Sequence, residues 1–291
     1  MSLQTIGVLG IGEMGSAVAT LLRDNGARVV TTLEGRSAKT RANAANAGVE
    51  DLGSMEEVVR ASDLVLSMLS SNAAPGVAHL LGEAAKSIGA HPLFGEFNAI
   101  APRTVQAIAA DIGGSMDVVD GGIIGGTGNL PAATFYLSGP RASEVAALSD
   151  YGFNTRLLGV VVGQASGMKL CYAGMTKGLS TMALDLLLAA TALGVAGPVL
   201  EQYQHSMSGV LQFIDRFVPG NPKRAIRRAE EMPEVAAMLE SLGFSGSIHR
   251  AAHQRMKWLG ELGLDTDGAT SAAEVAKQVI EATQTPVAAK G

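Results

Sequence analysis

The sequence predicts an α/β fold in which a doubly wound parallel sheet is followed by an all-helical C-terminal domain. Three observations favour this fold. Short apolar runs alternate with helix-like runs over the first 162 residues. Three glycines cluster between the first strand-like run and the first helix-like run. From about Gly163 onward the β-branched runs disappear and one helix-like segment follows another. We therefore expect two domains, residues 1–162 and residues 163–291.

The predicted strands are short and apolar, as strands buried in a parallel sheet are. In order they are TIGVLG, ARVVTTL, LVLSML, PLFGEFNA, MDVVDGG, TFYLSG and TRLLG. The helices between them begin with one in which apolar residues recur at helical spacing, and the glycine of DNG, residues 24–26, ends it. Further helices are expected over MEEVVRASD, GVAHLLGEAAKSIG and PRTVQAIAADIGG. In the C-terminal half, the stretch VPGNPKR, residues 218–224, is expected to be a loop.

Composition restricts the class of protein. A chain of 291 residues suits about two domains. Apolar residues make up 47% and charged residues 17%, so we expect another subunit to cover part of the surface, most simply in a homodimer. The net charge of −5 disfavours nucleic acid or an anionic membrane as partner. The single cysteine, Cys171, and the absence of a signal-like start favour a reducing, cytoplasmic compartment.

One apolar segment, residues 179–200, is long enough to imitate a membrane span. Asp185 interrupts it, no aromatic belt flanks it, and small residues dilute it. We interpret it as a helix buried between domains or subunits, and we expect no membrane partner.

The glycine cluster has the arrangement of a dinucleotide-binding turn. Between a strand and a helix the chain reads Gly10-Ile11-Gly12-Glu13-Met14-Gly15. In this Rossmann-type arrangement the first glycine permits a tight turn, the second lets the backbone approach a pyrophosphate, and the third lets helix and strand pack closely. The phosphates then lie at the helix N-terminus, where free N–H groups favour negative charge.

The sequence resembles the β-hydroxyacid dehydrogenase and 6-phosphogluconate dehydrogenase superfamily. The resemblance starts at GVLGIGEMGSA and continues, in order, through SDLVLSMLSSN, FGEFNAIAP, VDGGIIGGTG and GQASGMKLCYAGMTKG. It covers about the first 180 residues, and the rest is similar to the helical half of a short branch of the family. The resemblance implies a small-molecule substrate and a nicotinamide cofactor. It places the cofactor on the glycine turn, on the loop Leu69, Ser70 and Ser71, and at Asn98.

The end of the second strand bears on the choice between NADP and NAD. Glu34 is the kind of residue that binds a ribose 2′-hydroxyl and repels a 2′-phosphate. Arg36 and Ser37 match the positions where NADP-preferring relatives hold that phosphate, and arginine suits phosphate through its fork of donors. We expect NADP, with NAD as the alternative.

The resemblance makes Lys169 the expected general acid/base, whereas the residues alone also fit a surface lysine extending from a helix. Oxidation of a hydroxyl sends hydride to the nicotinamide and a proton to a base. A lysine accepts that proton only when its pKa falls from about 10.4 toward the working pH.

Two positions depart from the family pattern. Ala173 stands where the family usually has Asn, and Ile124 stands where it tends to have Ser. Tyr172 and Thr176 lie near the face of Lys169, so either is a candidate to orient the substrate. The backbone of Gly125 and Gly126 and that of Thr127 still offer N–H groups. These departures favour a substrate that is bulkier or less acidic than a simple 3-hydroxy acid.

The helix-like run IHRAAHQRMKWL places two histidines four residues apart, with three basic residues nearby: His249, His253, Arg250, Arg255 and Lys257. A zinc site is disfavoured because no third ligand follows, and we expect no metal. The alternatives are a solvated helix face and a cationic wall of the substrate pocket, with His253 as its candidate residue.

Three functions stay open at the level of sequence. The first is an NADP-dependent dehydrogenase or reductase that interconverts a small hydroxy acid, or a similar alcohol, and its keto form. The second is an imine reductase-like activity. The third is a nucleotide-binding regulatory protein without turnover, which the presence of Lys169 disfavours.

Overall fold

The computed structural model describes residues 3–266 and 268–284. It divides into two compact units, the first ending at Leu170 and the second starting at Cys171. The domain boundary predicted from the sequence, between residues 162 and 163, lies just before α7 (Gln164–Ala192), the helix that continues into the second unit. That boundary stays a prediction.

The first unit contains an eight-stranded sheet with the strand order β3-β2-β1-β4-β5-β6-β7-β8. All neighbouring pairs are parallel except β6 and β7, which run antiparallel. The sequence predicted a parallel sheet throughout, but the connection from β6 to β7 is too short for a parallel crossover. The strands are β1 (Thr5–Leu9), β2 (Arg28–Thr31), β3 (Glu50–Asp51), β4 (Leu64–Ser67), β5 (Leu93–Glu96), β6 (Asp117–Ile124), β7 (Thr134–Ser138) and β8 (Asn154–Gly159).

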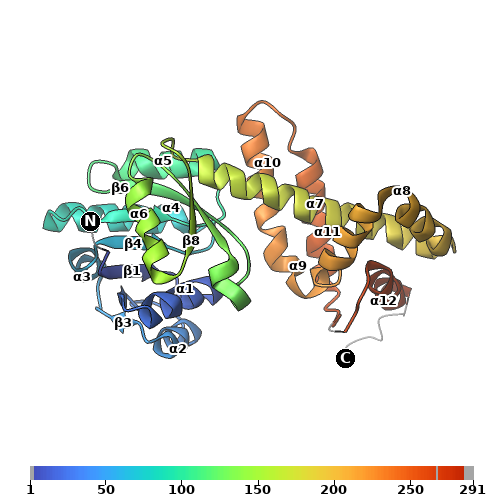
Figure 1. Cartoon of the computed structure of the whole chain (residues 1–291), viewed down its shortest axis with the longest axis horizontal. Helices are drawn as coiled ribbons and strands as arrows, with labels where there is room; N and C mark the ends of the chain where they lie inside the picture. The colour runs from blue at the N-terminus through green and yellow to red at the C-terminus, as the bar shows by residue number, and fades with distance from the viewer. Residues whose placement is uncertain (1–2, 267, 285–291) are drawn as a thin grey trace. The chain divides into compact units, whose positions relative to one another are not determined.

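Helices cover both faces of this sheet, which confirms the doubly wound class (Figure 1). One apolar core joins the sheet to α1 (Glu13–Asp24), α2 (Ala38–Ala47), α6 (Ala142–Val145) and the 3₁₀ helix η2 (Ala146–Tyr151). The opposite core joins it to α3 (Met55–Ala61), α4 (Ala74–Ile88) and α5 (Pro102–Ile112). A second 3₁₀ helix, η1 (Thr127–Ala132), lies between β6 and β7.

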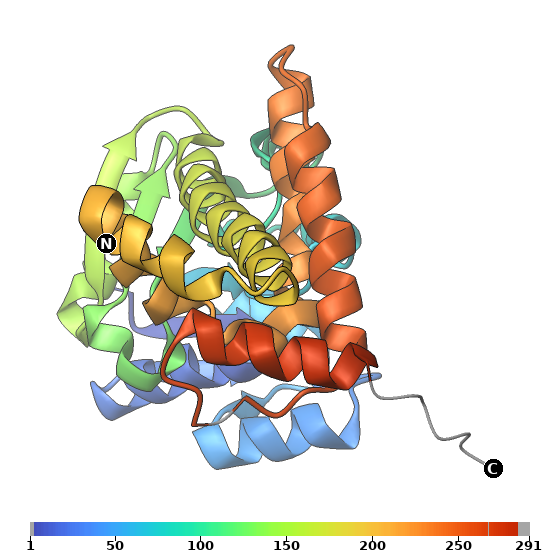
Figure 2. The same cartoon turned by 90° about the vertical axis from the view of Figure 1, so that its right-hand side faces the viewer.

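The second unit is entirely helical over its described residues (Figures 1 and 2). Its helices are α7 (Gln164–Ala192), which begins in the first unit, α8 (Ala196–Phe217), α9 (Asn221–Ala229), α10 (Glu231–Ser241), α11 (Ser247–Glu261) and α12 (Ala272–Gln284). The loop expected over residues 218–224 is shorter, because α9 already starts at Asn221. Pro222 is compatible with that start, since a first helical turn needs no N–H from proline.

The apolar segment over residues 179–200 is not one helix. Helix α7 ends at Ala192, and Gly194 turns the chain with φ +73° before α8 begins. One side of α7 supplies Ala183, Leu184, Leu187 and Leu188 to the core of the second unit. The other side leaves Met175, Met182 and Leu186 between 52% and 68% exposed, and Leu193, directly after the helix, is 75% exposed. None of the described helices is long and apolar enough to cross a membrane.

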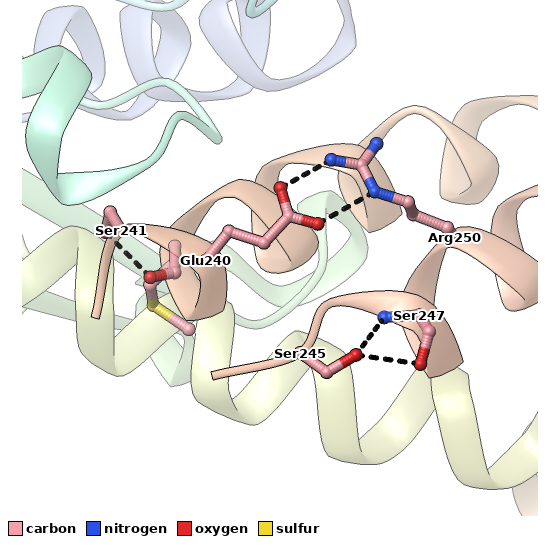
Figure 3. Close-up of polar contacts among 6 residues, drawn as sticks. Glu240, Ser241, Ser245, Ser247 and Arg250 are labelled. Carbon is pink, nitrogen blue, oxygen red and sulfur yellow. Dashed lines mark hydrogen bonds and ion pairs between the residues drawn. The ribbon is translucent and has the colours of Figure 1, made fainter. Parts of the chain in front are cut away.

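Helices α10 and α11 form an antiparallel hairpin whose connection is fixed by polar contacts (Figure 3). The Arg250 guanidinium donates to both carboxylate oxygens of Glu240, at 2.9 and 2.6 Å. In the connecting turn, the Ser245 hydroxyl donates to Ser247 Oγ at 2.9 Å. Arg250 therefore has a structural partner inside the hairpin.

Candidate active site

The three glycines of the first turn each meet a different steric demand. Gly10 has φ +92°, and a Cβ atom there would lie 2.3 Å from the Met68 carbonyl oxygen of the next strand end. A Cβ atom on Gly15 would lie 2.0 Å from the Gly10 carbonyl oxygen, so α1 closes on the turn only with glycine here. Around Gly12, by contrast, a Cβ atom would meet nothing within 4 Å. The backbone at Gly12 therefore faces open space that a ligand can approach.

The start of α1 suits a phosphate group. Gly12 is the N-cap residue and has no side chain that could accept a hydrogen bond. The N–H groups of the first turn of α1 therefore have no side-chain cap. The Ser16 hydroxyl in the same turn is buried and has no partner among the described residues. Free N–H groups at a helix N-terminus bind anions, so the glycine turn fits a dinucleotide pyrophosphate.

The loop after β2 places the residues predicted to choose between NADP and NAD at the start of α2. Gly35 turns the chain with φ +66°, and Ser37 is the N-cap of α2, where its hydroxyl accepts from the Thr40 N–H at 3.2 Å. The Arg36 guanidinium forms no hydrogen bond or ion pair with a described residue, Glu34 included. A cationic fork beside a helix N-terminus suits a phosphate, and the preference for NADP stays a prediction.

The carboxyl ends of β4 and β5 are joined by Asn98, which is 3% exposed. The Leu69 N–H donates to Asn98 Oδ1, and the Asn98 side-chain amide donates to Ser67 Oγ at 2.7 Å. These two contacts fix the loop that holds Leu69, Ser70 and Ser71. In an open parallel sheet, ligands bind outside the carboxyl ends of the strands, which is where this loop lies.

Beneath Asn98, four polar side chains form a row across four neighbouring strands. Ser67 on β4 pairs in register with Glu96 on β5, Glu96 with Asp120 on β6, and Asp120 with Ser138 on β7. Each of the four residues is at most 1% exposed. Since paired residues point to the same face of a sheet, we define Ser67, Glu96, Asp120 and Ser138 as the buried polar row.

Asp120 anchors the start of α7. Its Oδ2 atom accepts from the N–H groups of Gly163 and Ser166, at 3.0 and 2.9 Å, and from the Ser138 hydroxyl at 3.0 Å. Its Oδ1 atom accepts from the Ser166 hydroxyl. All four partners donate, as an ionised carboxylate requires, and negative charge is favourable at a helix N-terminus.

This anchor positions Lys169, three residues after Ser166 on α7. Lys169 Nζ lies 3.5 Å from the Phe97 carbonyl oxygen, at the end of β5 and next to Asn98. A Cβ atom on Gly122 would lie 2.5 Å from the Ala165 carbonyl oxygen and 3.1 Å from Lys169 Cβ. Glycine at 122 therefore allows α7 to pack directly on β6.

The glycine segment after β6 lies beside the glycine turn. The Thr127 hydroxyl donates to Glu13 Oε1 at 2.9 Å, which joins the predicted substrate segment to the first residue of α1. Gly125 has φ +146°, and a Cβ atom there would lie 2.4 Å from Ala133 Cβ, so this glycine is needed for the fold itself. Gly126 faces open space. Glycine turn, Asn98 and Lys169 thus share the carboxyl edge of the sheet with this segment.

The other predicted substrate residues belong to the second unit. Tyr172 is 45% exposed on α7, whereas Thr176 is buried and its hydroxyl donates to the Tyr172 carbonyl oxygen at 2.9 Å. His253 Nδ1 lies 2.9 Å from the Ala229 carbonyl oxygen, and Arg255 pairs with Asp185. Their substrate roles stay predictions. Within the described residues, no group of three or more His, Cys, Asp or Glu side chains has a geometry that holds a metal ion.

Sequence reasoning missed the buried polar row and Ser166. A usable signal was present, because Glu96 and Asp120 each follow an apolar run that was itself predicted as a buried strand. Charged residues are almost never fully buried unless they are paired, so two of them at matching strand ends indicate a built polar network.

The strand, glycine turn and helix, together with the polar carboxyl edge of the sheet, define a dinucleotide-binding α/β domain. Comparison with known families agrees. The chain belongs to the family defined by the NAD binding domain of 6-phosphogluconate dehydrogenase, which matches residues 5–150. A domain of unknown function, DUF1932, matches residues 190–259. The protein is accordingly an NAD(P)-dependent oxidoreductase of the dehydrogenase and reductase class.

Several known proteins are similar to this chain over most of its length. An uncharacterized 28.5 kDa protein of Methanothermus fervidus is 28% identical over 81% of this chain and 91% of its own. The conserved protein MTH1747, described as structurally similar to 3-hydroxyacid dehydrogenases, is 29% identical with a TM-score of 0.73, over 90% of this chain and all of its own. A 3-hydroxyisobutyrate dehydrogenase of Mycobacterium tuberculosis is 16% identical with a TM-score of 0.73, over 96% and 99%, and shows the fold alone.

Proposed function

We propose that this protein uses NADP to interconvert a small hydroxy acid, or a similar alcohol, and its keto form, with Lys169 as the general acid/base. The observation that carries the proposal is the position of Lys169 Nζ, 3.5 Å from the Phe97 carbonyl at the carboxyl end of β5. Asn98, two residues after Glu96, is proposed to place the nicotinamide end of the cofactor. Its side chain accepts from the Leu69 N–H and so fixes the neighbouring loop.

In this proposal each group has one task. A nicotinamide cofactor held at the glycine turn and Asn98 would supply the hydride chemistry at the substrate carbon, in either direction. Lys169 Nζ takes the hydroxyl proton during oxidation and returns it to the carbonyl oxygen during reduction. The N–H groups of Gly125 and Gly126 and the residue Thr127 hold the polar head of the substrate, with Tyr172, Thr176 and His253 as further candidates. Hydride and proton together balance the oxidation of an alcohol to a carbonyl.

A broad screen of hydroxy acids and keto acids, followed by nicotinamide absorbance, identifies a working substrate. On that substrate, Lys169→Met should keep its fold and NADPH affinity while kcat/KM falls by ~10²–10⁴-fold, the usual size of general acid–base catalysis. Lys169→Arg should also fail, since arginine does not release its proton near neutral pH. Lys86→Met, which changes an exposed lysine of α4, is the matched control and should keep the parent rate. Near-parental turnover by Lys169→Met would show that the lysine is structural.

Imine reduction is the second candidate. Ala173 and Ile124 replace the family Asn and Ser that suit a small acidic substrate. The same fold also occurs in an imine reductase from Streptomyces aurantiacus. Cyclic imines belong in the same screen, and turnover of imines without turnover of any hydroxy or keto acid would favour this candidate. Binding of NADPH with no turnover across the whole screen would favour a regulatory nucleotide-binding protein.

We also propose that the protein works as a homodimer in which α7 contributes to the contact. The exposed side of α7 carries Met175, Leu179 (half-buried), Met182, Leu186 and Ala189, and Leu193 follows directly after the helix. Their spacing alternates between four and three residues, as in the apolar seam of packed helix pairs. A second copy of the chain offers the same seam, so a two-fold contact buries both. Cytoplasmic localisation stays a prediction that rests on the single cysteine.

A further inference from the structure

Glu96 is the least satisfied member of the buried polar row. It is fully buried, and its Oε1 atom accepts from the Asn98 N–H at 2.8 Å. Its Oε2 atom is buried without a hydrogen-bond partner among the described residues. Burying a polar atom without a hydrogen-bond partner lowers the stability of the folded protein. The position of Glu96 therefore calls for an explanation other than its hydrogen bonds.

The neighbours of Glu96 favour its neutral form. Asp120, its partner in register on β6, is surrounded by four donors and therefore carries the negative charge of the pair. The pKa of Glu96 is raised from 4.5 to about 7, first by burial and to a smaller extent by the charge of Asp120, while hydrogen bonding to Asn98 and Ser67 acts in the lowering direction. The carboxyl group of Glu96 thus changes its charge near neutral pH.

The other elements around Glu96 bring few charges to it. On α7, Lys169 contacts the Phe97 carbonyl, one residue along from Glu96. On β4 and β7 the row has only the uncharged Ser67 and Ser138. The titratable side chains of α4 and α5 are all exposed, namely His79, Glu83, Lys86, Arg103 and Asp111. The electrostatic environment of Glu96 is therefore set by Asp120, Lys169 and whatever binds above Asn98.

We propose that Glu96 is a positioning residue behind Asn98 that releases its proton when the oxidised cofactor binds and keeps it when the reduced cofactor binds. The inference rests on the proposed function, which places the nicotinamide at Asn98. Oxidised nicotinamide is a cation, whereas the reduced ring is neutral. A carboxylate and a cation attract each other more strongly inside a protein than in water. Only the oxidised, cationic form of the cofactor therefore favours ionised Glu96. The released proton passes to solvent, and no covalent bond of cofactor or substrate changes.

The sign of the pH dependence follows. Proton release on binding means that NADP⁺ affinity rises with pH across the range in which Glu96 titrates. NADPH affinity lacks this contribution. The 2′-phosphate of the cofactor also titrates, but it is common to both forms and cancels in the ratio of their dissociation constants. That ratio therefore isolates the effect of the nicotinamide charge.

The test is isothermal titration calorimetry of NADP⁺ and NADPH from pH ~6 to ~8, in buffers of different ionisation enthalpy that count the protons released. In the parent protein, the ratio of NADPH to NADP⁺ dissociation constants should rise up to ~10-fold, which corresponds to a shift of about one pKa unit in Glu96. Glu96→Gln keeps the shape of the side chain but has no group that titrates in this pH range, so the ratio should no longer change with pH. A flat ratio in the parent, or an unchanged slope in Glu96→Gln, would overturn the inference.

Lys169 is a second group that could release a proton on NADP⁺ binding, because a cationic nicotinamide near it disfavours its protonated form. Lys169→Met should therefore keep the slope, and loss of the slope in this variant would assign the proton to Lys169 and overturn the inference. Infrared difference spectra of the parent protein give a test that needs no variant of Glu96. NADP⁺ binding should remove a carboxylic-acid C=O band that NADPH binding leaves in place, and an unchanged band would also overturn it. Failure of both cofactors to bind would instead overturn the proposed function.

Discussion

At the scale of single residues, Arg36 and Glu34 favour different cofactors from the same loop. Glu34 is exposed and suits a ribose hydroxyl, whereas Arg36 is half-buried beside the N-cap of α2 and suits a phosphate. The Arg36 guanidinium pairs with no described residue, so binding a 2′-phosphate there would break no existing ion pair. The Arg36 guanidinium, with no partner among the described residues, is the observation behind the prediction of NADP.

Arg36→Ala should therefore weaken NADPH and leave NADH nearly unchanged. Hydrogen bonds to a charged group contribute about 1.5–3 kcal/mol, so the loss should be about 10- to 100-fold in the NADPH dissociation constant. Fluorescence titration of both cofactors measures it. Lys39→Ala removes an exposed cation from the first turn of α2 and should change neither affinity by more than a small factor. Equal loss of NADPH and NADH affinity in Arg36→Ala would contradict the assignment.

For single residues, the sequence predicted roles best at glycines whose backbone conformation or close packing leaves no room for a side chain. Gly10 and Gly15 were expected to serve a tight turn and close packing, and the approaches of 2.3 and 2.0 Å that a Cβ atom would make at these positions agree with that. Gly125 was expected to hold substrate, yet its φ of +146° and its approach to Ala133 give it a role in the fold as well. Glu96 was missed because its importance depends on Asp120, which is distant in sequence and adjacent only across the sheet.

At the scale of elements, α7 is held at its start by one carboxylate. Asp120 on β6 accepts four hydrogen bonds, three of them from Gly163 and Ser166 of the α7 start. The direction of α7, and with it the position of Lys169, therefore depends on a residue of the sheet. The sequence did not predict this link, since nothing in the local pattern of VVDGG shows which helix its aspartate caps.

Asp120→Asn should destabilise the protein by roughly 2–3 kcal/mol, because the amide removes the charge at the helix start and leaves donors without an acceptor. Asp117→Asn on the same strand is the matched control. Asp117 is exposed and pairs with Arg141 at 2.7 Å, so its loss should cost under about 1 kcal/mol. Urea unfolding of the parent and both variants at one fixed pH measures the two changes in the free energy of unfolding. Equal destabilisation by the two variants would show that Asp120 does not anchor α7.

The direction of β7 shows a limit of pattern reading at this scale. Alternating strands and helices predicted the parallel direction of the strands up to β6, where helices connect one strand to the next, but the prediction lacked α2 and the two-residue strand β3. Between β6 and β7 lies only the short η1, so β7 turns back antiparallel. Strand type follows from local composition, whereas strand direction follows from the length of the connection.

At the scale of the whole molecule, the small share of charged residues finds a partial explanation in α7. This helix buries one side in the second unit and leaves the opposite apolar side exposed. Exposed apolar residues in a continuous seam mark a contact surface more often than isolated ones do. Sequence predicted that the segment over residues 179–200 would be covered, but only the structure separates its core side from its exposed side.

If this seam joins two copies, charges placed in it should separate them. The double variant Met182→Glu, Leu186→Glu puts two carboxylates on each copy at positions 56% and 52% exposed, so the second unit should still fold while a two-fold contact brings like charges together. Sedimentation equilibrium at micromolar concentration should give a dimer for the parent chain of 29.8 kDa and a monomer for the variant. Leu80→Glu on α4, at a leucine 59% exposed in the first unit, is the control and should stay dimeric. A monomeric parent would contradict the homodimer, and a dimeric double variant would place the contact on a surface other than α7.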